Sequence, residues 1–282
     1  MRDRSDLRDT ILFGDCRETL PMFNVKARMC VTSPPYYGLR DYGGEESQIG
    51  QEQTPEEFID ELVKVFREVR NVLTDDGTCW VNVGDSYYNY RPGRGQGLVK
   101  QTVSNNKQDL PDVCPRRGNR IRGLKEKDLI GIPWMFAFAM RADGWYLRQD
   151  IIWSKPNPMP ESVRDRCTKS HEYMFLFSKN QNYYFDVDAI KEPTRRKRSV
   201  WNVTKKPYKG AHFAVYPPEL IEPCIKAGSE EGDIVLDPFM GSGTTAMVAK
   251  SLGRDYIGCE LHEDYGNLIQ KRVKEYHPVE EV

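Results

Sequence analysis

The clearest hydrophobic pattern in the chain predicts a helix over residues 54–73. Its apolar positions recur at helical spacing and form one stripe: Phe58, Leu62, Val65, Phe66, Val69 and Leu73. Thr54 and Glu57 have the spacing of a capping box, and Pro55 occupies the first helical position, where its missing N–H costs nothing. The "DDG" sequence at 75–77 predicts a turn between this helix and the next strand.

Shorter apolar runs alternate with further helical patterns. Runs of strand type fall at 28–32, 78–85, 145–155, 171–179, 233–239 and 255–260. Helical patterns fall at 128–144, 240–253 and 263–276. Strands with near-continuous apolar cores that alternate with helices predict an α/β fold with a mostly parallel sheet flanked by helices. We expect one domain over 1–282, interrupted by an aperiodic insertion at 86–127.

Two short motifs lie at the ends of predicted strands. "SPPYY" at 33–37 follows the strand at 28–32, and "DPFMGSG" at 237–243 follows the apolar part of the strand at 233–239. Ligands of such sheets bind beyond the carboxyl ends of the strands. We therefore expect both motifs to line one cleft.

The second motif has the layout of a site for a nucleoside cofactor. Gly241 and Gly243 permit a tight turn and close backbone approach, and the helix that follows offers free N–H groups. The next strand ends in Glu260, whose carboxylate suits ribose hydroxyls. The motif lacks the third glycine of a dinucleotide fingerprint and the lysine of a P-loop. An ordinary strand-to-helix turn is the alternative interpretation.

The first motif, Ser33-Pro34-Pro35-Tyr36, cannot continue a strand because neither proline has an N–H to donate. A carbonyl held by prolines and the Ser33 hydroxyl can together accept two hydrogen bonds from one NH₂ group. Tyr36 can stack on a planar heterocycle. This arrangement suits the exocyclic amino group of a base removed from its stack. A proline terminator with packed tyrosines is the alternative interpretation.

Together, the two motifs resemble those of the S-adenosylmethionine-dependent DNA amino-methyltransferases. "DPFMGSGTT" is similar to the methionine-binding motif of that family, and "TSPPYYG" is similar to its catalytic motif. The catalytic motif comes first, which resembles the circularly permuted β-group. The resemblance implies a Rossmann-like methyltransferase fold, S-adenosyl-L-methionine as cofactor, and direct methyl transfer to an amino group of DNA.

The resemblance also implies roles for individual residues. The catalytic residues would be Ser33, Pro34, Pro35 and Tyr36. The residues at the cofactor would be Asp15, Asp237, Pro238, Phe239, Gly241, Ser242, Gly243, Thr244 and Glu260. We expect Trp153 and Lys155 beside the target base, with a core position as an equal alternative for Trp153. No residue is expected to bind a metal.

The motifs are compatible with more than one target base and more than one class of substrate. Serine before Pro-Pro favours cytosine N4 in this family, whereas aspartate would favour adenine N6; adenine is the alternative because Ser-Pro-Pro-Tyr also occurs in adenine enzymes. RNA and protein glutamine are further alternative substrates, and a catalytically inactive DNA-binding module is the alternative to an enzyme. Cys224 follows proline, as in C5 enzymes, but its helical setting predicts a buried thiol.

Composition adds limits on the class of protein. The 41 basic and 42 acidic residues give a net charge of −1, which excludes a uniformly polycationic chain but allows a local basic face. Seven cysteines without a C-x-x-C pair predict reduced thiols. The charged N-terminus and the lack of a long apolar run predict a cytoplasmic protein without a membrane partner. The resemblance implies a bacterial, archaeal or phage origin.

Two irregular stretches are strongly basic. Residues 91–127 hold ten Lys and Arg against three Asp and Glu, and residues 191–210 hold eight against one, a net charge of +7 in each. Trp201 and Tyr208 add aromatic rings to the second stretch. Such loops suit double-stranded DNA as a partner. Solvated surface charge is the alternative interpretation.

One of these stretches is expected to recognise the target sequence. The β-group carries its recognition region after the segment that resembles "IIWSK", which favours 160–210 in this chain; the insertion at 86–127 is the rival. The expected DNA contacts are Arg195, Arg196, Lys197 and Arg198. A cognate restriction endonuclease would be a second partner, with phage protection and regulation as the other biological settings.

Overall fold

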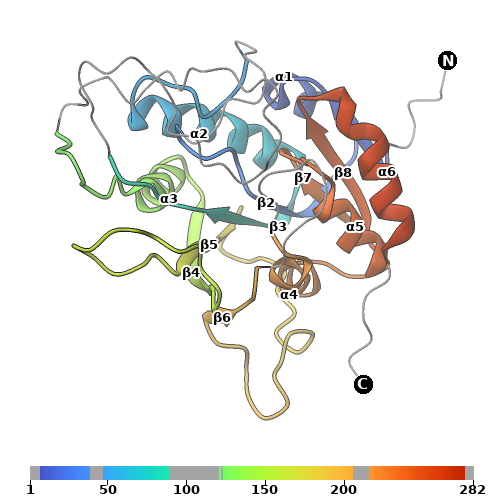
Figure 1. The fold of residues 1–282 in the computed structure, drawn as a ribbon. Coiled ribbons are helices and arrows are strands. Elements are labelled where there is room, and N and C mark those ends of the chain that lie inside the picture. The colour runs from blue at the N-terminus through green and yellow to red at the C-terminus, as the bar shows by residue number, and fades with distance from the viewer. Residues whose placement is uncertain (1–6, 39–46, 89–120, 122, 206–215, 277–282) are drawn as a thin grey trace.

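The computed structural model describes residues 7–38, 47–88, 121, 123–205 and 216–276. Within these residues, eight strands form one sheet with helices on both faces (Figure 1). The elements are β1 (Thr10–Phe13), α1 (Cys16–Thr19), η1 (Leu20–Met22), β2 (Ala27–Thr32), α2 (Pro55–Val72), β3 (Leu73–Val83), α3 (Ile132–Ala142), β4 (Tyr146–Ser154), β5 (His171–Ser178), β6 (Val200–Asn202), α4 (Pro218–Gly228), β7 (Ile234–Asp237), α5 (Thr244–Ser251), β8 (Asp255–Glu260), η2 (Glu263–Tyr265) and α6 (Gly266–Glu275).

The strand order is β1-β8-β7-β2-β3-β5-β4-β6. Every neighbouring pair is parallel except the two pairs that β5 makes, so the predicted α/β fold with a mostly parallel sheet is confirmed. From β2 the chain passes through α2 to β3 on one side, and from β7 through α5 to β8 on the other. The winding therefore reverses between β2 and β7, where sheets of this kind bind ligands.

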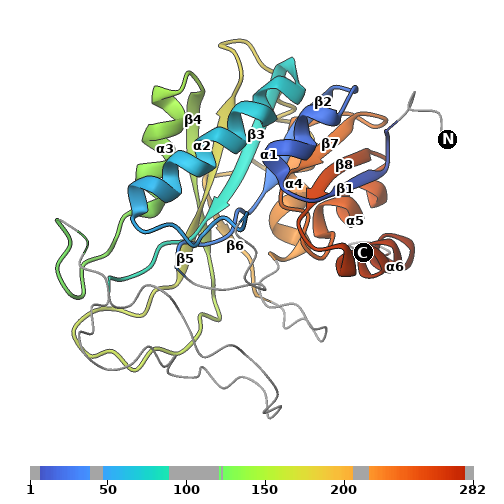
Figure 2. The same cartoon turned by 90° about the horizontal axis from the view of Figure 1, so that it is seen from above.

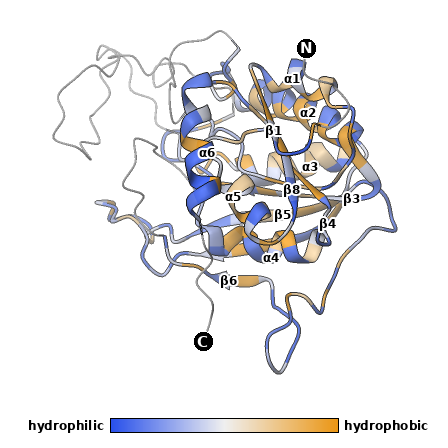
Figure 3. Ribbon diagram, turned by 90° about the vertical axis from the view of Figure 1, so that its right-hand side faces the viewer, coloured by the Kyte–Doolittle hydropathy of each residue, from blue (hydrophilic) through white to orange (hydrophobic). Residues whose placement is uncertain are grey.

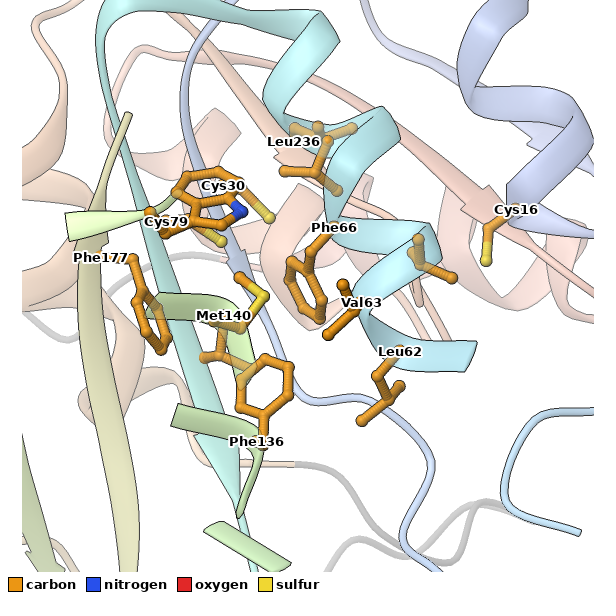
Figure 4. Packing of buried hydrophobic residues seen from close by; sticks show 14 of the residues in the cluster. Cys16, Cys30, Leu62, Val63, Phe66, Cys79, Phe136, Met140, Phe177 and Leu236 are labelled. Atoms are coloured by element: carbon orange, nitrogen blue, oxygen red, sulfur yellow. The ribbon is translucent and has the colours of Figure 1, made fainter. Parts of the chain in front are cut away.

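Successive residues of each strand face opposite layers of helices. Cys30 of β2 packs in the layer of α2 and α3, whereas Met29 and Val31 pack in the layer of α4 and α5. Figure 4 shows Phe66 of α2 and Phe136 of α3 meeting over the sheet; their ring centroids are 5.2 Å apart. Figure 2 shows α2 and α3 next to each other on one side of the sheet. The hydrophilic face of α6 is turned outward in Figure 3.

Helix α2 begins as the sequence predicts. Thr54 Oγ1 accepts from the N–H of Glu57 (3.2 Å), and Glu57 Oε2 accepts from the N–H of Thr54 (3.1 Å), so both halves of the capping box are present. Pro55 is the first residue of the helix. Helix α3 likewise carries Pro133 in its first turn. Among the described residues, no helix combines the length and apolar character that a membrane crossing requires.

The predicted turn at 75–77 is wrong. Strand β3 begins at Leu73, directly after α2, and runs through these residues. The register shifts between the Ala27–Leu73 and Met29–Thr78 pairs, so β3 holds additional residues that have no partner on β2. Such an irregularity, like a β-bulge, absorbs additional residues without ending the strand, so a turn-type sequence can lie inside it.

We expect Thr54→Ala to lower the free energy of unfolding by about 1 kcal/mol, because alanine cannot accept the N–H that Thr54 now satisfies. Urea denaturation measures this loss. Asp60→Ala, an exposed change on the same helix, is the control. A loss for Thr54→Ala no larger than that of the control would contradict the role of the cap.

Candidate active site

The carboxyl ends of β2 and β7 meet near the middle of the sheet. The strands are parallel neighbours, with Met29 opposite Val235. Thr32, at the end of β2, donates from Oγ1 to Oδ1 of Asp237, at the end of β7, over 2.6 Å. The Ser-Pro-Pro-Tyr motif and the glycine-rich turn, which follow these two residues, therefore start side by side.

Asp237 is buried and accepts three further hydrogen bonds. The donors are the hydroxyls of Thr245 (2.5 Å) and Tyr216 (3.2 Å) and the backbone N–H of Phe239 (3.0 Å). Burial raises the pKa of Asp237, and these hydrogen bonds together with that from Thr32 oppose the rise. Asp237 thus fastens the turn to β2, to α5 and to the segment before α4.

A cavity of about 330 Å³ opens at this place and is lined by both motifs, so they share one cleft as expected. The predicted site residues that line it are Asp15, Ser33, Pro34, Pro35, Tyr36, Trp153, Lys155, Pro238, Phe239, Gly241, Ser242 and Glu260. The predicted residues outside its lining are Asp237, Gly243, Thr244, Arg195, Arg196, Lys197 and Arg198. Lining residues that the sequence did not indicate include Asn82, Glu172, Tyr216 and His262.

The two glycines of the turn have different surroundings. Both have positive φ, +53° at Gly241 and +81° at Gly243, a region that favours glycine. Gly241 lines the cavity, and its N–H donates to Glu260 Oε2 over 2.7 Å. Gly243 faces α6 instead: a Cβ there would lie 2.6 Å from Cγ2 of Ile269. Gly241 is therefore the glycine that presents backbone to the cavity.

Arg272 of α6 holds the residues around Gly243. Its guanidinium donates to the carbonyl of Ser242 (2.8 Å) and to the hydroxyl of Thr244 (3.1 Å). Ser242 is at the cavity, whereas Thr244 lies behind it as the first residue of α5. The back of the turn is thus fixed by one cation from the last helix.

Two buried polar groups face the cavity at the end of β8. Glu260 accepts from the N–H groups of Gly241 and His262, the latter over 3.0 Å, and burial raises the pKa of its carboxyl. His262 Nε2 is buried and has no hydrogen-bond partner within the described part of the chain. A buried polar atom without a partner is costly, so a ligand that offers one would be favoured here.

Asp15 lines the cavity from the start of α1. It caps that helix by accepting the N–H of Arg17 over 2.8 Å. The guanidinium of Arg17 pairs with Asp15 (2.5 Å) and with Glu61 of α2 (2.5 Å). This network holds the Asp15 carboxylate in one orientation beside the cavity.

The Ser-Pro-Pro-Tyr hook is supported by the strands beyond β2. The Ser33 hydroxyl lies 3.5 Å from Oδ1 of Asn82 on β3, and Nδ2 of Asn82 donates to the carbonyl of Tyr173 on β5 (3.0 Å). The Tyr36 hydroxyl donates to Oε2 of Glu172 (2.7 Å) and lies 3.3 Å from Oδ1 of Asn82. Both polar ends of the hook are therefore held by side chains from neighbouring strands.

Trp153 and Lys155 line the cavity from the carboxyl end of β4. Trp153 is 2% exposed and donates from Nε1 to the carbonyl of Val203 (2.8 Å), so it both belongs to the core and lines the cavity. Lys155 Nζ lies 4.2 Å from the centroid of the Trp153 ring and forms an ion pair with Glu172.

The basic stretch before β6 lies away from the cavity lining. Residues 195–198 precede β6 at the outer edge of the sheet, and Arg195 pairs with Glu192 over 2.5 Å. The expectation that Trp201 is a DNA-contacting aromatic is wrong, because it is 5% exposed and packs 6.5 Å from the Trp80 ring. Tyr208 lies outside the described residues.

The two described ends of the insertion lie side by side. Tyr87 bridges to Leu129, and the N–H of Tyr88 donates to the carbonyl of Asp128 over 2.8 Å. Residues 89–120 and 122 lie outside the described part. Arg166, from the β4–β5 connection, lies 3.9 Å above the Tyr87 ring, so this connection packs against the base of the insertion.

Residues 27–271 match the N6/N4 methyltransferase family model, described as DNA methylase. The chain is 49% identical over 281 residues to the Type II methyltransferase M.XycI of Xanthomonas campestris pv. cyanopsidis. That alignment covers 95% of this chain and 89% of the relative.

Solved structures resemble the fold over most of its length. A PvuII DNA methyltransferase described as cytosine-N4-specific matches with a TM-score of 0.67 at 20% identity, over 93% of this chain and 85% of that one. A protein of Thermus thermophilus solved with S-adenosyl-L-methionine matches with a TM-score of 0.63 at 26% identity, over 93% and 91%. The predicted Rossmann-like methyltransferase fold is confirmed.

Substitution of Gly241 and of Gly243 should lower the stability of the fold by different amounts. Gly241→Ala and Gly243→Ala both place a Cβ at positive φ, but only the second collides with Ile269. We expect Gly243→Ala to lower the free energy of unfolding by about 1–3 kcal/mol more than Gly241→Ala, as overpacking does. Thermal and urea denaturation of the pair measure the difference. Equal losses would show that Ile269 yields without cost.

Proposed function

The chain belongs to the N6/N4 DNA methylase family, and we propose that it transfers a methyl group from S-adenosyl-L-methionine to the exocyclic N4 amino group of a flipped cytosine in double-stranded DNA. One observation carries the proposal: the glycine-rich turn and the Ser-Pro-Pro-Tyr hook line the same cavity. A cofactor and a base held there would lie in one enclosed space, and direct transfer depends on such positioning.

The residues around the turn fit a nucleoside cofactor. Each oxygen of Glu260 accepts one backbone N–H and can accept a second hydrogen bond, from a ribose hydroxyl. His262 Nε2 has no hydrogen-bond partner among the described residues, and His262 lines the same cavity as Gly241. Asp15 would face the adenine from α1. S-adenosylmethionine, when bound, supplies a methyl group on a sulfonium leaving group.

The hook fits an amino group. The lone pair of an exocyclic amine is delocalised into the ring, which makes the nitrogen a poor nucleophile. Ser33 Oγ and the Pro34 carbonyl would accept its two N–H groups, favour a more tetrahedral nitrogen and orient the lone pair. Tyr36 would hold the base by stacking. A nucleophilic cysteine is unnecessary, and Cys224 is buried in α4 outside the cavity lining, where burial raises the pKa of its thiol.

The proposal of cytosine rather than adenine as the target base rests on Ser33. Serine before Pro-Pro favours cytosine N4 in the enzymes that this motif resembles. Adenine N6 is the second candidate, because the same hydroxyl and carbonyl can accept its amino group. As the relative is named a Type II methyltransferase, we also propose a cognate restriction endonuclease as the partner in the cell.

Methylation-aware sequencing of DNA from cells that express the chain tests the base and the target together. We expect N4-methylcytosine at one short sequence and none in cells that express Ser33→Ala at equal levels. N6-methyladenine would establish the second candidate instead. Binding of tritiated cofactor without methylation of any DNA would indicate an inactive DNA-binding module, and methylation of RNA or protein alone would overturn the DNA substrate.

The proposed DNA contacts predict a change in salt dependence. The logarithm of the DNA association constant falls linearly with the logarithm of the salt concentration. Each lost phosphate contact should reduce the magnitude of that slope by about one. We propose contacts from residues 195–198 and, because it borders the cavity, from the β4–β5 connection. Arg196→Ala and Arg164→Ala each remove one exposed cation, and Lys64→Ala on α2 is the control. An unchanged slope for either arginine would remove its segment from the interface.

A further inference from the structure

Glu172 reaches the cavity because its strand runs backward. Strand β5 is antiparallel to both of its neighbours, so its first residues lie at the edge where the other strands end. Glu172 is the second residue of β5 and is paired in register with Trp153 of β4. A carboxylate is thereby placed among the side chains that would surround the base.

Each oxygen of Glu172 has its own partner. Oε2 accepts the hydroxyl of Tyr36 over 2.7 Å, and Oε1 pairs with Nζ of Lys155. The side chains are 12% exposed for Lys155 and 16% for Glu172. A carboxylate so far removed from water requires a compensating cation and satisfied hydrogen bonds, and Lys155 and Tyr36 supply them.

The Tyr36 ring is confined on a second side by the backbone. A Cβ at residue 84 would lie 2.6 Å from Cε2 of Tyr36, so the ring rests against Gly84. The contact with Gly84 restricts the ring, and the hydrogen bond to Glu172 fixes the hydroxyl at its far end. A phenylalanine could stack on a base equally well, but it would lack this anchor.

We propose that Glu172 is a positioning residue, which holds the Tyr36 ring in the orientation that receives the target base, with Lys155 balancing its charge. This inference rests on the proposed stacking role of Tyr36. It extends the site to β4 and β5, which lie beyond the two motifs. It also accounts for tyrosine rather than phenylalanine at position 36, because phenylalanine has no hydroxyl to donate to the carboxylate.

A double-mutant cycle tests the proposal. We expect Tyr36→Phe and Glu172→Ala each to lower kcat/KM for DNA on the order of tenfold, as loss of a hydrogen bond to a charged group does. The double variant should be no worse than the poorer single variant, because the hydrogen bond between Tyr36 and Glu172 is already absent from each single variant. Methyl incorporation from tritiated S-adenosylmethionine into plasmid DNA provides the rates. Multiplication of the two losses would overturn the proposal.

Two controls separate positioning from damage to the fold. Glu172→Gln keeps the size and an oxygen that can accept from Tyr36, so its activity should lie between wild type and Glu172→Ala. Glu222→Ala removes a carboxylate from a surface ion pair on α4 and should leave the rates unchanged. Activity of Glu172→Gln at or below that of Glu172→Ala would contradict a hydrogen-bonding role.

Binding of S-adenosylhomocysteine, followed by calorimetry, should be unchanged in Glu172→Ala, since Glu172 contacts the hook and not the turn. Loss of that binding would overturn the proposal. The cycle can be measured on whichever base the enzyme methylates. Methylation of adenine would therefore refute the proposed base and leave the test of Glu172 intact, whereas an unaffected Tyr36→Phe would refute the positioning role alone.

Discussion

The site depends on one buried carboxylate that joins two strands. Asp237 ends β7, and its hydrogen bond to Thr32 ties that end to β2 at the place where the winding of the sheet reverses. Removing a carboxylate from water is costly unless hydrogen bonds replace the lost hydration. Besides Thr32, the hydroxyls of Thr245 and Tyr216 and the N–H of Phe239 donate hydrogen bonds to Asp237. The same bonds that make this burial tolerable set the spacing between the two motifs.

Short-range sequence signals were sufficient to predict the start of a helix and the edge of the sheet at which the site lies. The capping box at Thr54 and the proline at 55 placed the start of α2, since both act within one helical turn. The shared cleft also followed from the sequence, because parallel strands end at one edge of a sheet. These rules located Ser33 and Gly241 at the cavity without knowledge of any contact between them.

The errors arise where distant strand pairing decides the outcome. The turn predicted at 75–77 lies within β3, because the ladder with β2 shifts register there. Trp201 is buried because β6 joins the sheet edge beside β4, which no local pattern indicates. Glu172 was overlooked for the same reason: only the reversed direction of β5 brings it to Tyr36. His262, two residues beyond β8, carries no sequence signal that separates it from an ordinary loop residue.

The paired ends of the insertion have an evolutionary consequence. Tyr87 and Tyr88 meet Leu129 and Asp128 directly, so the described ends of the insertion are held next to each other. The entropy of closing a loop rises only slowly with its length. Residues between these ends can be lengthened, shortened or exchanged while the sheet and the cavity keep their geometry. A change in the number of residues between these ends therefore costs little stability, so the length of the chain at this place can vary during evolution.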